Sequence, residues 1–214
     1  MVSRAKALAR GKASRDSTSE LLRGVYVENL AAGRATASSV GARLGVEPSS
    51  VRTALLKASA KGLVKTARGL VAITPAGRRR LKVVMMGGAF EIIHPGHVDA
   101  LSEARQLGNT LVVVVATDES VQKNKGRPPV TSQALRVGLV SSIRQVDLAL
   151  PGNRGSIYEI LLKIRPDVVA LGYDQRHNAD LIAEEAAKRG IRIRTARLGT
   201  QIPDLKTSKI LQSL

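Results

Sequence analysis

Hydrophobic positions in the first third of the chain recur at helical spacing and then change to short extended runs. Leu22, Val25, Tyr26 and Leu30 fall near one face of a helix predicted from Ser17 to about Ala32. The later elements predicted by the pattern are a helix over 37–44, a turn over 45–48, a helix capped by Ser49 or Ser50, and two β-prone runs over 63–65 and 70–73. The segment therefore reads as three helices followed by a hairpin.

The third of these helices has an apolar face and a basic face. Apolar residues repeat at i, i+3, i+4 and i+7, and the DNA-binding candidates on the other face and on the hairpin are Arg52, Lys57, Lys61 and Arg68. Three helices and a basic hairpin form the plan of a winged helix-turn-helix, whose third helix enters the major groove. The stretch 37–78 resembles winged-helix regulators of the multiple-antibiotic-resistance and iron-regulator type. That resemblance implies the fold only, and binding of double-stranded DNA and mere docking both stay open.

Residues 82–214 alternate short apolar runs with helical patterns. The run 111–116 is continuous and β-branched, as is typical of a strand buried on both faces. Strands are predicted over 82–86, 111–116, 146–150, 168–171 and 191–195. Helices are predicted over 95–107, 132–143, 156–164 and 179–189 and from about Thr207, and 123–131 is predicted to be a loop. This alternation predicts right-handed crossovers and an α/β fold with a doubly wound parallel sheet.

Charge separates the two segments. Residues 1–82 hold 17 basic and 4 acidic side chains, whereas the rest of the chain holds 17 basic and 13 acidic ones. This asymmetry suggests an attached nucleic-acid-binding module, with a basic soluble surface as the alternative. The first fifteen residues contain no acid and are rich in Arg, Ala and Ser, which resembles a transit peptide; we favour a disordered basic arm, with a transit peptide as the alternative. We therefore expect a disordered basic arm over 1–16, a winged helix over 17–81 and a catalytic or sensing domain over 82–214.

Composition excludes several classes of function. The chain has no cysteine, which excludes disulfides and thiolate metal sites and fits a reducing cytoplasm. Aromatic residues make up 2%, too few for single-strand binding by stacking. No apolar run reaches the length of a membrane span, so we expect no membrane partner.

Candidate chemistry concentrates where the first predicted strand of the second segment meets its first helix. Two of the three histidines, His94 and His97, lie there at i and i+3 on one helix face. Pro95 suits the first helical position, and Gly96 would let a phosphate approach the backbone. A helix N-terminus with two imidazoles suits a phosphoryl group. No third ligand is nearby, so we expect no protein-held metal. The glycine fingerprints of dinucleotide-binding and P-loop proteins are absent.

The sequence His94-Pro95-Gly96-His97 resembles the HxGH signature of the nucleotidyltransferase superfamily of the cytidylyltransferase type. Five further stretches resemble motifs of that family in order, at 117–119, 123–127, 146–147, 166–175 and 206–210. Pro95 and the last two stretches are similar to those of archaeal FAD synthetases. This resemblance implies transfer of AMP from ATP to FMN, giving FAD and pyrophosphate. The first motif is shared by glycerol-3-phosphate cytidylyltransferases.

The resemblance also implies roles for individual residues. Catalytic roles fall on His94, His97 and Lys125. Nucleotide-binding roles fall on Gly88, Ala89, Phe90, His94, Pro95, Gly96, His97, Lys123, Asp174, Thr207 and Ser208. Arg136 and Arg197 are further candidates for phosphate contact. Mg²⁺ is expected to arrive with the nucleoside triphosphate.

Alternatives stay open at this point. Ala89 and Glu91 stand where the family commonly has Thr and Asp, and the cysteines common in archaeal FAD synthetases are absent. The nucleotide could be CTP, and the acceptor could be glycerol 3-phosphate or another phosphoalcohol. A hypothesis from another functional class is that the protein is a DNA-binding transcription regulator that senses a nucleotide or flavin. We also expect a homodimer.

Overall fold

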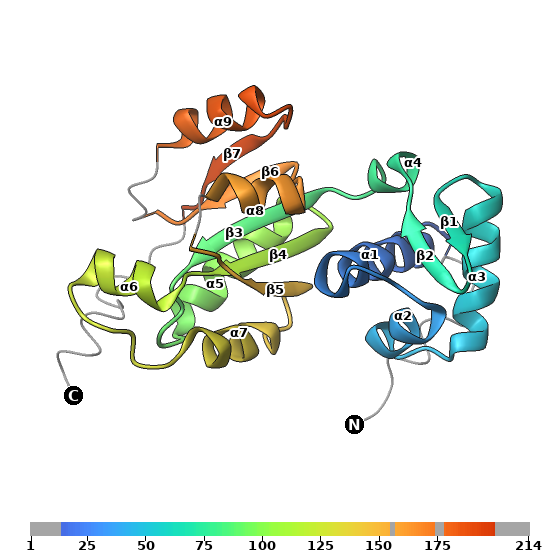
Figure 1. Cartoon of the computed structure of the whole chain (residues 1–214), viewed down its shortest axis with the longest axis horizontal. Coiled ribbons are helices and arrows are strands. Elements are labelled where there is room, and N and C mark those ends of the chain that lie inside the picture. Colours follow the sequence, from blue (N-terminus) through green and yellow to red (C-terminus); the bar gives the residue numbers. More distant parts are fainter. Residues whose placement is uncertain (1–13, 155–156, 174–177, 200–214) are drawn as a thin grey trace. The chain divides into compact units, whose positions relative to one another are not determined.

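The computed structural model describes residues 14–154, 157–173 and 178–199. The chain divides into two compact units, Met1–Leu81 and Lys82–Leu214. Each unit has its own hydrophobic core. The helices and strands of both units are labelled in Figure 1. No helix within the described ranges is both long and apolar enough to cross a membrane.

The first unit consists of helices and one small antiparallel sheet. Its elements are α1 (Ser14–Ala32), α2 (Ala37–Leu44), α3 (Pro48–Ala60), β1 (Val64–Ala67), β2 (Leu70–Ile73) and the short α4 (Pro75–Arg78). Thr36 and Ser39 form a reciprocal capping box at the start of α2. Our prediction of a serine cap for α3 is wrong. Pro48 begins that helix and Glu47 is its N-cap, because a proline lacks the N–H that the first turn leaves unpaired.

The hairpin is closed by a tight turn of left-handed residues. Arg68 has φ 50° and Gly69 has φ 77°, and Val64 lies opposite Ile73 in the sheet. Asn29 of α1 donates to the Val71 carbonyl at 2.9 Å and accepts from the Ile73 N–H at 3.3 Å. These two bonds tie the hairpin to α1.

The second unit is built on a five-stranded parallel sheet. Its strands are β3 (Val83–Gly88), β4 (Thr110–Val115), β5 (Leu148–Pro151), β6 (Val168–Leu171) and β7 (Arg194–Arg197). Their order across the sheet is β5-β4-β3-β6-β7. The chain adds strands to one side of β3 and then to the other, so the switch of direction lies between β3 and β6. In such sheets ligands bind outside the carboxyl ends of the strands at this point.

Helices cover the sheet and bury its strands. They are α5 (Pro95–Gln106), α6 (Asp118–Lys125), α7 (Gln133–Ser141), α8 (Ile157–Ile164) and α9 (Ala179–Lys188). One core cluster joins Val84 and Met86 of β3 to Leu101 of α5 and Val140 of α7. In Figure 1, α5 lies behind the sheet and α8 lies in front of it. The α/β architecture with a parallel sheet is thus confirmed.

The structure corrects our sequence expectations at two elements. The stretch from Lys123 to Lys125, expected to begin a loop, is the last turn of α6, which Thr117 caps and left-handed Gly126 (φ 72°) ends. The last strand, β7, begins at Arg194 rather than Ile191 and pairs with β6. The expected last helix lies outside the described residues, as does most of the expected basic arm; α1 begins within that arm, at Ser14.

Candidate active site

The His94–His97 motif lies at the carboxyl end of β3, where α5 begins. His94 is the N-cap of α5, in extended conformation, and Pro95 is the first helical residue, as the sequence predicted. The backbone N–H of His97 donates to the carbonyl of His94 at 2.9 Å. Both imidazoles therefore stand at the positive end of a twelve-residue helix.

The two imidazoles contact each other and a buried aromatic ring. The ring centroids of His94 and His97 are 3.9 Å apart, and the rings of His97 and Phe90 are 5.4 Å apart. Phe90 is 2% exposed and has φ 51°, a left-handed conformation that costs a non-glycine residue about 1–3 kcal/mol. A Cβ on Gly88 would lie 2.7 Å from the Phe90 ring, so a glycine is needed there. The loop after β3 thus carries backbone strain at Phe90, and the ring of this residue packs against His97.

Burial favours the neutral form of the His94 side chain. Desolvation lowers the pKa of His94 below its ordinary value, because burial disfavours the imidazolium. Its Nδ1 atom is buried and has no hydrogen-bond partner among the described residues. A buried polar atom without a partner is costly, so this nitrogen would gain from a ligand.

Glu91 ties this loop to the basic segment at the end of α6. Its side chain is fully buried, and its carboxylate accepts hydrogen bonds from Lys125 and from Arg127, the latter at 2.8 Å. The Val130 N–H donates to the same carboxylate at 3.3 Å. Burial alone would raise the pKa of Glu91, but the bonds from Lys125 and Arg127 outweigh it and lower the pKa. Glu91 is therefore ionised and holds two cations beside the histidine loop.

The sequence of the second unit is similar to those of known proteins. The model of the family described as cytidylyltransferase-like matches residues 85–211, more than half of the chain. The chain belongs to this family. The match covers the strand, loop and helix that carry His94 and His97.

Individual relatives agree with the family. The FAD synthase of Pyrococcus abyssi is 40% identical over 142 residues, which cover 65% of this chain and 95% of that protein. The FAD synthase of Aciduliprofundum boonei is 44% identical over 115 residues, or 54% of this chain and 76% of that protein. Among solved structures, a lipopolysaccharide core biosynthesis protein from Thermoplasma volcanium has a TM-score of 0.54 and 34% identity, covering 57% of this chain and 99% of that chain. The second unit is therefore a nucleotidyltransferase.

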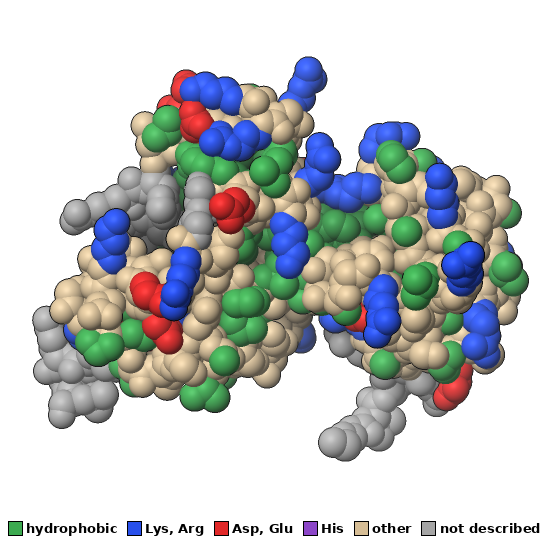
Figure 2. Space-filling model, in the orientation of Figure 1, with side chains coloured by type: hydrophobic (Ala, Val, Ile, Leu, Met, Phe, Trp, Pro, Cys, Tyr) green, Lys and Arg blue, Asp and Glu red, His purple; other side chains and the backbone are tan. Residues whose placement is uncertain are grey.

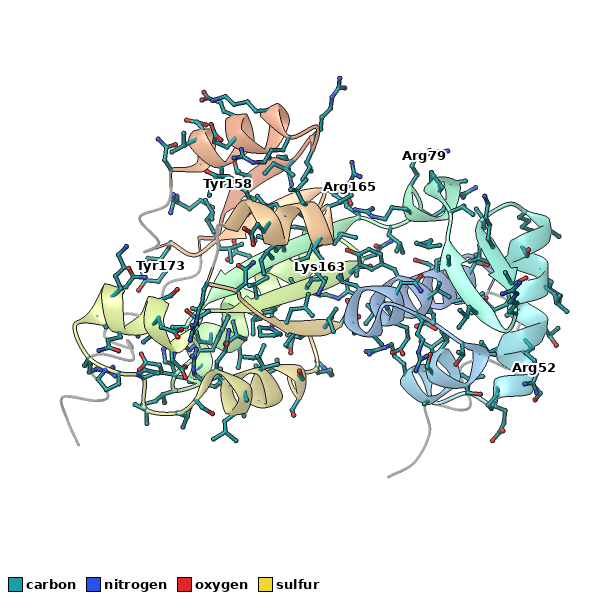
Figure 3. All side chains as sticks on the ribbon, in the orientation of Figure 1. Arg52, Arg79, Tyr158, Lys163, Arg165 and Tyr173 are labelled. Atoms are coloured by element: carbon teal, nitrogen blue, oxygen red, sulfur yellow. The ribbon has the colours of Figure 1, made fainter. Side chains whose placement is uncertain are left out.

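The structure brings many of the predicted site residues to one edge of the sheet. Residues of the β3–α5 connection lie together there, namely Gly88, Ala89, Phe90, His94, Pro95, Gly96 and His97. Lys123 is exposed in the last turn of α6, and Lys125 is bonded to Glu91. Arg197 ends β7 at the same edge and donates to the Gly172 carbonyl at 3.1 Å. Tyr173, labelled in Figure 3, is the last described residue before Asp174. Asp174, Thr207 and Ser208 lie outside the described residues.

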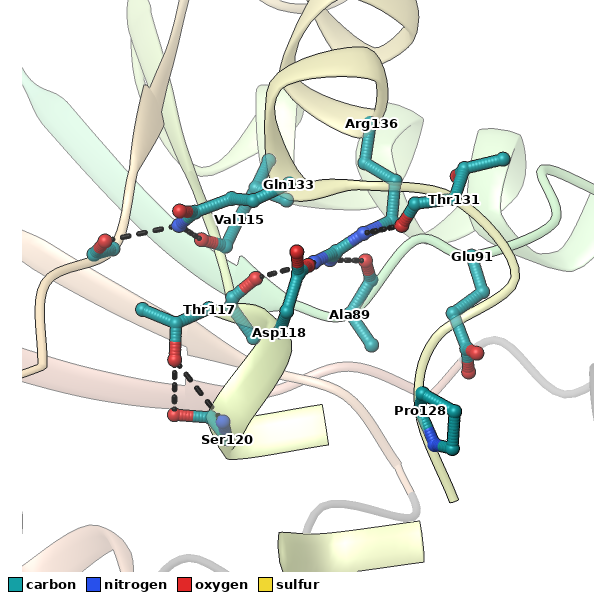
Figure 4. Close-up of polar contacts among 12 residues, drawn as sticks. Ala89, Glu91, Val115, Thr117, Asp118, Ser120, Pro128, Thr131, Gln133 and Arg136 are labelled. Atoms are coloured by element: carbon teal, nitrogen blue, oxygen red, sulfur yellow. Dashed lines mark hydrogen bonds and ion pairs between the residues drawn. The ribbon is translucent and has the colours of Figure 1, made fainter. Parts of the chain in front are cut away.

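Arg136 has partners other than the expected phosphate. Its side chain is 1% exposed, and its guanidinium donates to carbonyls and to a carboxylate of the protein (Figure 4). The geometry therefore gives no support to phosphate contact by this arginine. Within the described parts of the chain, no cluster of three or more His, Asp or Glu side chains could hold a metal ion.

Sequence reasoning missed the roles of Glu91 and Arg127. From the sequence, Glu91 is interpreted only as a departure from the family pattern, and Arg127 only as part of the motif-like stretch 123–127. A signal was present, since an acid in an otherwise apolar stretch (Phe90 to Ile93) must be buried with a cationic partner.

Proposed function

We propose that the protein is an FAD synthase that transfers AMP from ATP to FMN. The observation that carries this proposal is the histidine pair at the start of α5, within a sequence about 40% identical to an FAD synthase over 95% of that relative's length. A sensor would need affinity alone, whereas side chains aimed at a reacting phosphate favour catalysis.

The proposed reaction is an in-line substitution at the α-phosphorus of ATP. A phosphate oxygen of FMN forms a bond to this phosphorus, and the bond to the bridging β-phosphate oxygen breaks, so pyrophosphate leaves with the electron pair. FMN phosphate is already anionic, so no strong general base is needed. The protein must position two anions and stabilise the charge that spreads between them.

The histidine pair is proposed to hold the α-phosphate. A neutral imidazole has one N–H donor, and the N-terminus of α5 adds free backbone N–H groups. His94 and His97 would donate to the non-bridging oxygens, where charge grows in the transition state. The lowered pKa of His94 favours its neutral form, which still has one N–H to donate.

The other proposed roles follow the charge of the triphosphate. Lys123 and Lys125 would contact the phosphates from the end of α6. Thr207 and Ser208 are proposed to bind the β- and γ-phosphates, and Asp174 to accept hydrogen bonds from nucleotide or acceptor. Mg²⁺ would enter on the triphosphate, bound to its hard oxygens.

A substrate panel tests the proposal. The protein is incubated with ATP or CTP, Mg²⁺ and one of FMN, glycerol 3-phosphate or phosphoethanolamine, and pyrophosphate release is measured. We expect release with ATP and FMN and formation of FAD. Pyrophosphate release only with CTP and a phosphoalcohol would replace the proposal by a cytidylyltransferase function. If none of the acceptors gives pyrophosphate release, a sensor function would be favoured.

A second candidate function belongs to the first unit, which we propose is a winged helix that binds duplex DNA. The observation that favours it is a set of exposed basic side chains on α3, its C-cap and the hairpin, namely Arg52, Lys57, Lys61, Lys65 and Arg68. Figure 3 shows Arg52 projecting from α3, and Figure 2 shows many Lys and Arg side chains and few acidic ones over this unit. A basic surface of this kind suits a phosphate backbone.

Salt dependence tests DNA binding. Each neutralised phosphate releases counterions, so affinity for duplex should fall steeply as salt rises. Neutralising Arg52, Lys57, Lys61 and Arg68 together should abolish binding. No retention of duplex at low salt would leave the unit a docking module. The expected homodimer and cytoplasmic location stay predictions, and light scattering measures the first.

A further inference from the structure

Arg136 is a buried charged side chain beside the proposed active site. It lies in the first turns of α7, and it is the largest side chain with less than 2% exposure among the described residues. Burying a guanidinium costs several kcal/mol unless its donors are bonded. The bonds it makes therefore indicate why an arginine stands there.

The guanidinium bonds four acceptors from three stretches of the chain, one at Ala89, one at Ala116 and Asp118, and one at Thr131. Its Nε donates to the Thr131 carbonyl at 3.1 Å, and its Nη1 donates to the Ala89 carbonyl. Its Nη2 donates to the Ala116 carbonyl at 2.9 Å and to Oδ1 of Asp118 at 2.6 Å. Figure 4 shows these acceptors arranged around one planar group. The loops after β3 and β4, the first turn of α6 and the approach to α7 are thus fixed to one another.

Two of these acceptors belong to the segments that carry the proposed catalytic groups. Ala89 precedes the strained Phe90, whose ring contacts His97. Asp118 begins α6, and the last turn of this helix carries Lys123 and Lys125. An apolar side chain could fill the same volume without any cost of burying charge, so packing alone does not call for an arginine.

We propose that Arg136 is a positioning residue for AMP transfer. By bonding Ala89 and Asp118 with one rigid fork, it sets the position of the histidine loop relative to the lysines of α6. It acts through these segments and does not touch the substrate. This inference rests on the proposed function, and a displacement of about 1 Å is enough to lower a rate about 10²-fold.

The test compares three variants of the full chain. Arg136→Lys keeps the charge but replaces the planar fork by a point donor, which cannot serve all four acceptors. Val140→Ala shortens a fully buried side chain of the same helix and controls for lost stability. Arg144→Lys controls for the same substitution at an exposed arginine. FAD formation is measured at a temperature below the lowest thermal midpoint of the proteins compared. The rate is divided by the concentration of molecules that bind ATP, which calorimetry measures.

We expect Arg136→Lys to lower kcat about 10- to 100-fold, with the KM for ATP changed less than about threefold. Both controls should stay within about twofold of the parent protein. A merely structural role would lower the thermal midpoints of Arg136→Lys and Val140→Ala and leave kcat per binding molecule alike in both, which would overturn the proposal.

A second readout does not depend on the acceptor. The three histidines of the chain can be followed by NMR during a pH titration. If Arg136 holds the loop, Arg136→Lys should let the pKa of His94 rise toward its ordinary value, and Val140→Ala should not. An unchanged His94 titration overturns the inference. Failure of the parent protein to make FAD would instead refute the proposed function, and the titration would still decide the role of Arg136.

Discussion

Removal of the His97 imidazole should separate catalysis from folding. His97 contacts the rings of His94 at 3.9 Å and Phe90 at 5.4 Å between centroids. Each aromatic contact contributes about 0.5–1.5 kcal/mol, so His97→Ala should lower the free energy of unfolding by roughly 1–3 kcal/mol. Loss of one preorganised donor to a developing charge costs about 10²–10³ in kcat, or roughly 3–4 kcal/mol. The effect on rate should therefore exceed the effect on stability.

The assay measures kcat, KM and the thermal midpoint with ATP and FMN, together with ATP affinity by calorimetry. ATP affinity should change little, because the donor contributes most when charge develops in the transition state. His94→Ala should resemble His97→Ala, and His177→Ala is the control because His177 lies outside the motif. Near-normal kcat in folded His97→Ala would refute the assignment of this site, and the sensor reading would then replace it.

Three further predictions concern charge and organisation. Glu91→Gln should lower the free energy of unfolding by about 1–3 kcal/mol and raise the KM for ATP, because Lys125 and Arg127 lose the carboxylate that accepts their hydrogen bonds. An unchanged free energy of unfolding in denaturation together with an unchanged KM in kinetics would contradict this. Burial lowers the pKa of His94, so as pH falls this histidine binds a proton in the unfolded chain before it does so in the folded protein. The thermal midpoint should therefore decrease as the pH is lowered below about 6.5, and this decrease should be smaller in His94→Gln. Trypsin should cut near Arg78–Lys82 and leave a fragment that binds ATP, and loss of ATP binding by that fragment would count against independent units.

The buried strands and the start of α5 could be predicted because one kind of signal dominates each. Residues 111–115 are apolar without interruption, and all but one of them are fully buried in β4, between neighbouring strands on both sides. Pro95 marks the first turn of α5, since proline suits that position alone within a helix. Both signals depend on neighbouring residues in the chain, so these two elements can be predicted from the sequence.

Helix α6 was missed because its stability comes from its ends. Seven of its eight residues are polar, and only Val121 is buried. The signals were Thr117 as a cap, acids in the first turn, lysines in the last turn and Gly126 at the end. Each contributes about 1 kcal/mol or less, and reading for apolar periodicity gives such terms no weight. The predicted position of the last strand was also wrong, because the bounds of β7 are set by its pairing with β6 at the edge of the sheet and not by an apolar run.

Arg136 shows a limit of a different kind. Three of its four acceptors are backbone carbonyls. Every residue has a carbonyl, so no pattern of side chains predicts which ones will accept these hydrogen bonds. The acceptors at Ala89 and Ala116 lie 47 and 20 residues away in the chain, and only the parallel pairing of β3 with β4 brings both to one edge of the sheet. From the sequence, an arginine near a predicted phosphate-binding edge is therefore interpreted as a ligand contact. In the structure its donors instead bond three backbone carbonyls and the carboxylate of Asp118.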